Sequence, residues 1–219
     1  EDFQTSEKRP TVFPLPDTKL VDEFGQWKAK DWPDKTHSFA EMATMMQGQE
    51  GPAAYPFSTW DKWGGAKNRK LTRGSGFFSR LKTDDGRWHL VDPAGCAYFS
   101  VGPCGTNPGD SYRVDHLEKL CDWLPDENDP EFKRFYSQGT MQRTPYMEAE
   151  TFKNFNFLQA NLFRVYGKNW YEKWQELSYH ILMGNGLNTQ GNFPGLDVNN
   201  GHGKLPYVRE MADFPLTDT

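Results

Sequence analysis

Amide side chains recur along a short segment near the C-terminal end of the sequence. Asn188, Gln190 and Asn192 alternate through residues 187–193, which predict a short strand that enters a loop. A carboxamide presents a donor and an acceptor together, as two neighbouring hydroxyl groups require. These three residues are therefore candidate ligands of a polyhydroxylated substrate, although Asn in a glycine-rich loop also commonly forms a turn.

A second group of polar residues follows another predicted strand. Residues 97–102 predict this strand, and they end in a Gly/Pro/Asn loop, residues 103–109, of the kind that often carries function after a strand. The candidates around this end are Ser100, Cys104, Asn107 and Arg113. Phe193 adds an aromatic ring beside the second strand, so one wall of a binding site is expected from these residues.

Several elements are expected ahead of these strands. Residues 1–35 are rich in proline and predict an extended arm that docks through apolar side chains. Ser38 and Glu41 form a capping box for a helix that ends near residue 49. Residues 77–82, 88–91 and 97–101 predict an antiparallel meander, because Asp- and Gly-containing turns separate them.

The second half of the chain predicts helices and two further strands. Residues 105–145 lack a sustained period and predict an ordered insertion, because a long loop with several aromatic residues is usually packed. Apolar residues three or four apart predict one helix from Phe152 to Val165 and another from Trp170 to Ile181. Residues 184–186 end the second helix, and residues 207–211 predict a last strand.

Composition excludes some classes of partner. The chain has 25 basic and 30 acidic residues, and no basic stripe long enough to follow a phosphate backbone, so nucleic acid is not expected. No run of about 18 apolar residues predicts a membrane span. Aromatic residues make up 15% of the chain, which suits either a packed core or stacking on the faces of sugars. The three cysteines show no zinc-site spacing, and no metal or cofactor is expected.

Most other titratable residues have simpler interpretations than catalysis. Glu148 and Glu150 precede the helix predicted from Phe152 to Val165, where negative charge complements the helix dipole. Residues 126–131 are interpreted as a solvated acidic loop. The five histidines lack metal-ligand spacing, and His180 beside an apolar stripe is expected to be packed.

Several ordered blocks resemble the β-agarases of glycoside hydrolase family 50. Residues 85–95 and 98–102 are similar to a hairpin that leads into the first barrel strand in that family. Similar blocks follow in the same order at residues 20–26, 31–33, 123–125, 157–162, 166–167 and 186–193. The chain departs from the family at Phe193, where the family usually has Trp, and across residues 180–187.

The resemblance implies an α/β fold, with the first two or three strands of a (β/α)8 TIM barrel. The expected divisions are an arm at 1–35, a helix, loop and antiparallel hairpins at 36–96, and the N-terminal part of a barrel at 97–219. Retaining enzymes of this type use two carboxyl groups. The resemblance implies two Glu residues after the fourth and seventh strands, and since the chain has no Asn-Glu pair, both are expected beyond residue 219.

The expected activity is hydrolysis of a β-linked galactan such as agarose, with these 219 residues inactive alone. Expected partners are the galactan and the rest of the same polypeptide or a complementary fragment, in a secreted, periplasmic or cell-surface setting. One alternative is a non-catalytic carbohydrate-binding or scaffold protein derived from the same barrel. Another is an unrelated β-sandwich lectin, against which the two predicted helices count.

Overall fold

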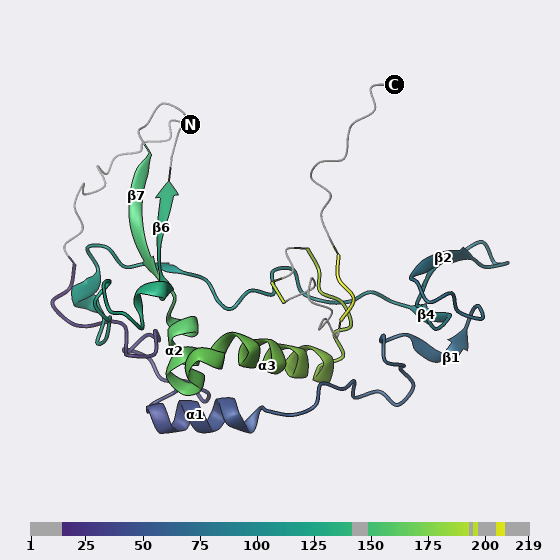
Figure 1. Ribbon diagram of the computed structural model, residues 1–219, viewed down its shortest axis with the longest axis horizontal. Helices are drawn as coiled ribbons and strands as arrows, with labels where there is room; N and C mark the ends of the chain where they lie inside the picture. The colour runs from purple at the N-terminus through teal and green to yellow at the C-terminus, as the bar shows by residue number, and fades with distance from the viewer. Residues whose placement is uncertain (1–14, 142–148, 193–194, 197–204, 209–219) are drawn as a thin grey trace, which may run out of the picture. The chain divides into compact units, whose positions relative to one another are not determined.

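The computed structural model describes residues 15–141, 149–192, 195–196 and 205–208. Figure 1 shows their helices and strands along the chain. These residues belong to two compact units. One unit combines residues 1–35 with 111–157, and the other combines 36–110 with 158–219. The predicted N-terminal arm therefore shares a unit with most of the predicted insertion. No helix among the described residues is both long and apolar enough to cross a membrane.

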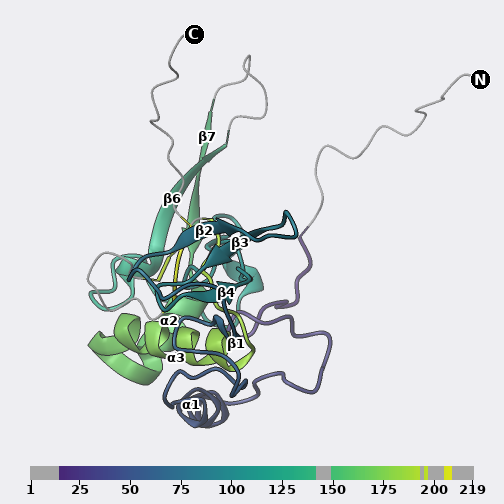
Figure 2. The same ribbon diagram turned by 90° about the vertical axis from the view of Figure 1, so that its right-hand side faces the viewer.

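A four-stranded antiparallel sheet lies in the unit formed by 36–110 and 158–219. Its strands are β1 (Ala66–Lys70), β2 (Ser79–Lys82), β3 (Trp88–Val91) and β4 (Cys96–Tyr98), in the order β1-β4-β3-β2 (Figure 2). Gly86 and Gly95 occupy the two hairpin turns with φ of 82° and 92°, a region that favours glycine. The predicted meander is confirmed.

Two details of this sheet differ from the prediction. Residues 66–70, which lie outside the three strands predicted for the meander, form the edge strand β1, which pairs with β4 despite having four exposed residues and no hydrophobic alternation. Strand pairing, and not side-chain pattern, therefore defines β1. The predicted strand 97–101 ends as β4 at Tyr98, because the backbone of Val101 pairs outside this sheet, with Asn188 and Thr189.

The same unit contains the helices. Helix α1 (Phe39–Gly48) begins where predicted, with the Ser38 hydroxyl accepting a hydrogen bond from the Glu41 amide at 3.1 Å. The Glu41 carboxylate accepts from the His37 amide at 2.7 Å, one residue before the position expected in a capping box. Helix α3 (Trp170–Gly184) is confirmed and follows a short 3-10 turn, η3 (Gly167–Asn169).

The other unit contains a three-stranded antiparallel sheet. Its strands are β5 (Tyr112–Arg113), β6 (Tyr136–Met141) and β7 (Glu150–Phe155), in the order β5-β7-β6. Two 3-10 turns, η1 (Glu118–Leu120) and η2 (Lys133–Phe135), lie between β5 and β6. The predicted ordered insertion therefore contributes β5 and β6 to this sheet, while the rest of its described part consists of 3-10 turns and loops.

The predicted helix start at Phe152 is wrong. Residues 150–155 form β7, and helix α2 (Phe157–Tyr166) begins two residues later. Phe152 pairs with Gly139 of β6, and Phe155 pairs with Tyr136. Phe152 and Phe155 match the spacing of a helix by chance, and the partner strand β6 decides the conformation.

Aromatic packing forms the core of this unit. Phe155 is completely buried, and its ring centroid lies 4.7 Å from that of Tyr136 and 4.9 Å from that of Phe157. Burial of one such side chain contributes about 1.5–3 kcal/mol. The N-terminal segment is attached beside this core, because the amides of Leu20 and Val21 both donate to the Leu120 carbonyl, at 2.8 and 3.0 Å.

Candidate functional site

Backbone hydrogen bonds bring the two predicted strand ends together. The amides of Asn188 and Thr189 donate to the Val101 carbonyl at 2.9 and 3.1 Å, and the Gly191 amide donates to the Pro103 carbonyl at 2.8 Å. A third stretch follows on the other side, where Gln190 and Tyr207 form a parallel bridge. Three segments therefore lie side by side, in the order in which they occur in the chain: residues 101–105, 188–192 and 206–208.

Glycines permit this close approach. A Cβ atom at Gly102 would lie 1.6 Å from the Thr189 carbonyl oxygen, and one at Gly191 would lie 2.7 Å from the Pro103 carbonyl oxygen. Both separations are shorter than any tolerated contact. Larger residues at these positions would push the two segments apart and break the bonds between them.

Asn188 holds the strand ends in place. Its side chain is fully buried, and its Oδ1 accepts from the Val101 amide at 2.9 Å. Its Nδ2 donates to the carbonyls of Phe99 and Gly64 at 2.9 and 3.2 Å. Both polar atoms of this predicted sugar ligand are thus engaged within the protein, which gives Asn188 a structural role in the arrangement described here.

Three hydroxyl groups extend this network. The Thr189 Oγ1 lies 2.7 Å from the Tyr98 hydroxyl and 2.8 Å from the Ser100 Oγ. Tyr98 also donates to the Asn188 carbonyl at 2.8 Å. Burial raises the pKa of Tyr98 to about 12, so its hydroxyl stays protonated and donates at any physiological pH. Ser100, a predicted ligand, is exposed and shares its hydroxyl with this network.

Two side-chain atoms without a hydrogen-bond partner lie further along residues 188–192. Gln190 is fully buried, and its Oε1 accepts from the Thr106 hydroxyl at 3.1 Å, whereas its Nε2 has no partner among the described residues. The Oδ1 of Asn192 is also buried without a partner in the described part of the chain. Because buried polar groups are nearly always paired, a partner for these two atoms is expected outside the described residues.

The remaining predicted ligands occupy different surroundings. Cys104 and Asn107 are exposed in the loop that follows residue 102, and Cys104 is a free thiol. Phe193 lies outside the described residues. Arg113 belongs to the other unit, where its guanidinium binds both oxygens of Asp115 at 3.0 Å and Glu150 at 2.6 Å. The Nε and Nη2 atoms of Arg113 are thus engaged within the protein.

The Arg113 ion pair also corrects the interpretation of Glu150. Glu150 is the first residue of β7, so it does not complement a helix dipole as predicted. Glu148 lies outside the described residues.

Thr106 is a positioning residue that the sequence did not indicate. Its hydroxyl accepts from the Gly195 amide at 2.9 Å while it donates to Gln190. This role could not be predicted, because a threonine in a Gly/Pro/Asn loop has no pattern that distinguishes it from an ordinary turn residue.

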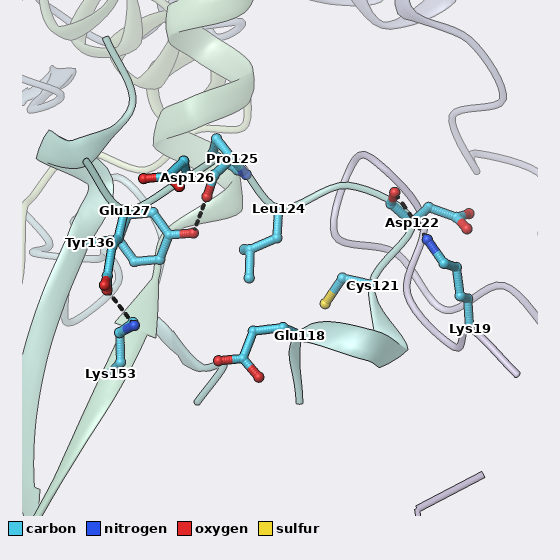
Figure 3. Close-up of a pocket in the computed structure, with 10 residues that line it drawn as sticks. All are labelled: Lys19, Glu118, Cys121, Asp122, Leu124, Pro125, Asp126, Glu127, Tyr136 and Lys153. Carbon is cyan, nitrogen blue, oxygen red and sulfur yellow. Dashed lines mark hydrogen bonds and ion pairs between the residues drawn. The ribbon is translucent and has the colours of Figure 1, made fainter. Parts of the chain in front are cut away.

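An acidic cavity of about 380 Å³ lies in the unit formed by residues 1–35 and 111–157 (Figure 3). Its acidic lining residues are Glu118, Asp122, Asp126 and Glu127. Glu127 pairs with Lys153, and Asp122 pairs with Lys28 at 2.5 Å. Cations neutralise these two carboxylates, and Asp126, Glu127 and Glu131 are exposed, as expected for a solvated acidic loop. We assign no catalytic carboxyl pair to this cavity.

Three possible metal ligands meet in the described part of the chain. Oxygen atoms of Asp61 and Asp92 and the sulfur of Cys96 all lie within 4.8 Å of one another. Burial raises the pKa of the Cys96 thiol, and a neutral thiol is a poor ligand. A closed structural zinc site also has four ligands, so we assign no metal to this cluster.

Known proteins similar to this chain are agarases. Beta-agarase B from Vibrio sp. (strain JT0107) is 25% identical over 197 residues, which cover 80% of this chain and 20% of the relative. Beta-agarase A from the same strain is 27% identical over 139 residues, covering 60% of this chain and 13% of the relative. No protein-family model matches.

Solved structures that are similar to this chain also include agarase structures. The structure of PfGH50B is 26% identical with a TM-score of 0.71, and it covers 92% of this chain and 31% of its own. That of an agarase, AgWH50C, is 25% identical with a TM-score of 0.61, and it covers 81% of this chain and 28% of its own. The resemblance to β-agarases is confirmed. The agarase-like chain spans about a fifth of the length of beta-agarase B and less than a third of these two solved chains.

An exo-beta-agarase structure supports the fold alone. It is 21% identical with a TM-score of 0.71, and it covers 90% of the agarase-like chain and 33% of its own. The two antiparallel sheets and the helices of this chain therefore correspond to part of an agarase structure.

Proposed function

We propose that this chain forms part of a glycoside hydrolase that cleaves a β-linked galactan such as agarose. The observation that carries the proposal is the pair of unmet amide atoms, Gln190 Nε2 and Asn192 Oδ1, beside two adjacent strand-end segments. The similarity to agarases gives this chemistry a substrate class, because agarose is a polyhydroxylated polymer.

We further propose that the three parallel stretches are the first strands of a (β/α)8 barrel. Consecutive parallel strands with helices between them are the defining feature of that fold. Residues 101–105 and 188–192 pair directly, and the connection between them includes α2 and α3. The Gln190–Tyr207 bridge adds the next stretch in the same direction. On this proposal residues 97–219 belong to the barrel, 36–96 precede it, and 1–35 form an arm.

The sugar-binding wall is proposed to lie at the strand ends. Asn192, Gln190, Asn107 and Cys104 are its central members, because their loops follow the paired segments. Ser100 borders the wall, and Phe193 would supply a ring for stacking on the C–H face of a sugar. Asn188 is proposed to position these residues, since its own atoms are engaged.

The reaction would follow the retaining mechanism, in which one carboxyl group acts as acid and base and another as nucleophile. We assign neither carboxyl group to residues 1–219. The binding residues named here would hold the sugar while carboxyl groups after the fourth and seventh strands act on the glycosidic bond. Because the polymer stays outside the cell, we propose a secreted, periplasmic or cell-surface location.

The test measures hydrolysis and binding separately in the polypeptide that carries these residues. We expect release of reducing ends from agarose and retarded migration in agarose-containing gels. Asn192→Ala should weaken oligosaccharide binding about fivefold, which corresponds to the loss of one hydrogen bond of about 1 kcal/mol. Asn128→Ala, an exposed site in the acidic loop of the other unit, is the matched control and should leave binding unchanged.

The alternatives give different results. Binding without hydrolysis would favour the carbohydrate-binding or scaffold protein derived from the same barrel. Neither binding nor hydrolysis of any β-linked galactan would refute the proposed function.

A further inference from the structure

Two short loops face each other behind the strand-end segments. In the first, the Asp61 Oδ1 accepts from the amides of Trp63 and Gly65 at 2.8 and 3.0 Å. In the second, the Asp92 Oδ1 accepts from the Cys96 amide at 2.8 Å. Each aspartate therefore uses its Oδ1 to close its own loop, and its Oδ2 takes no part in these hydrogen bonds.

The second oxygens of the two aspartates meet in the interior. Asp61 Oδ2 and Asp92 Oδ2 are both buried, and neither has a hydrogen-bond donor among the described residues. Oxygen atoms of the two carboxyl groups nevertheless lie within 4.8 Å of each other. Asp92 is 1% exposed, and a Cβ atom at Gly65 would lie 1.8 Å from its Oδ2, so the space beside this oxygen is filled by backbone.

Nearby charged groups do not neutralise this pair. The titratable groups that face it are Cys96, Tyr55, Tyr98 and Lys70. Burial raises the pKa of Cys96 and the pKa of both tyrosines, so these three groups are neutral at pH 7. Lys70, an exposed residue of the edge strand β1, is the cation among them, and it acts on the Cys96 thiol.

Two ionised carboxylates in this position would repel each other strongly. An isolated buried charge costs several kcal/mol, and a group in such a position usually takes up a proton instead. Burial is the largest cause that raises the pKa of Asp92, and the nearby Asp61 carboxyl raises it further, against the Cys96 amide, which lowers it. A single proton would convert the repulsion into a hydrogen bond.

We propose that Asp61 and Asp92 share one proton between their Oδ2 atoms, and that this pair positions Asn188 and the polar segment that follows it. The connection runs through the Gly64 carbonyl, which lies in the Asp61 loop and accepts from the Asn188 Nδ2 at 3.2 Å. A Cβ atom at Gly64 would lie 2.5 Å from the Asn188 Cβ, so any shift of this loop displaces Asn188.

The sign of the pH effect follows from the shared proton. The folded protein holds this proton more tightly than the unfolded chain does. The pair therefore contributes most to stability below the ordinary carboxyl pKa of about 3.9, and this contribution declines as pH rises toward the raised pKa of the folded state. Loss of the proton would loosen the Asp61 loop and the position of Asn188.

Infrared spectroscopy of the protein that carries these residues tests the proton directly. At pH 7 we expect a protonated-carboxyl C=O band that shifts on exchange into D₂O. Asp92→Asn and Asp61→Asn should each abolish the band, because the amide supplies a permanent donor to the remaining carboxylate. Asp85→Asn, in the exposed β2–β3 turn, is the matched control and should retain it.

Thermal unfolding across pH provides a second readout. The melting temperature of Asp92→Asn relative to the original protein should rise as pH increases from 4 to 8, whereas Asp92→Ala should be less stable at every pH. Absence of the infrared band in the original protein would overturn the shared proton. So would one tightly bound divalent metal ion per chain that is lost in Cys96→Ser.

The positioning part of the proposal rests on the proposed function and has its own measurement. Oligosaccharide affinity should fall with rising pH in the original protein and stay flat in Asp92→Asn. Equal pH profiles for the two proteins, with the band present, would reject the positioning role. If neither protein binds any galactan, the proposed function fails while the infrared result still decides the shared proton.

Discussion

Replacing Asn188 with alanine should open the contact between residues 101–105 and 188–192. The change removes one bond accepted from the Val101 amide and two donated to the carbonyls of Phe99 and Gly64. A buried amide left without a partner costs about 1–3 kcal/mol, and each lost carbonyl bond costs about 1 kcal/mol. The local opening free energy should therefore fall by about 3–5 kcal/mol.

Hydrogen exchange reports this local change in the intact protein. Since each 1.4 kcal/mol corresponds to a factor of ten, amides in peptides that cover residues 99–105 should exchange about 100–4,000 times faster in Asn188→Ala. Asn192→Ala is the control, because its Oδ1 has no partner in the described chain, and it should change exchange less than about fivefold. Equal exchange in the two variants would refute the structural role of Asn188.

Further substitutions test the surroundings of this contact. Gly102→Ala would place Cβ 1.6 Å from the Thr189 carbonyl oxygen, and it should lower the melting temperature and the soluble yield more than any other alanine substitution in this loop. Tyr98→Phe should cost about 1–2 kcal/mol by urea unfolding. Because burial raises the pKa of Tyr98 to about 12, the original protein should lose stability between about pH 10 and 12, and Tyr98→Phe should lack that loss. Thr106→Val should cost about 1–2 kcal/mol and increase exchange near Gln190; unchanged exchange there would exclude the Thr106 contact.

The local turns of the fold were predictable from sequence. Ser38 caps α1, and Gly86 and Gly95 occupy hairpin turns, because each of these residues acts on backbone groups within a few positions. The end of α3 at Gly184 was also expected from the glycine stop at residues 184–186.

Features that depend on distant partners were not predictable. Strand β1 lacks an alternating pattern, and β7 carries phenylalanines at helical spacing, so a neighbouring strand decides both. Asn188 and Asn192 look equivalent in sequence, two amides on alternate positions. The carbonyl of Gly64, 124 residues away from Asn188, distinguishes them by engaging Asn188, whereas the Oδ1 of Asn192 has no partner among the described residues. No spacing rule reports a contact of that length.

The interleaving of the two units has a consequence for synthesis on the ribosome. The sheet β1–β4 can form once residue 98 has emerged, but the Val101 amide must wait for Asn188, 87 residues later. At about 5–20 residues per second this interval lasts roughly 4–17 s. During that time residues 111–157 can fold with the N-terminal segment, while the edge at residues 99–105 stays unpaired and open to chaperones or to aggregation.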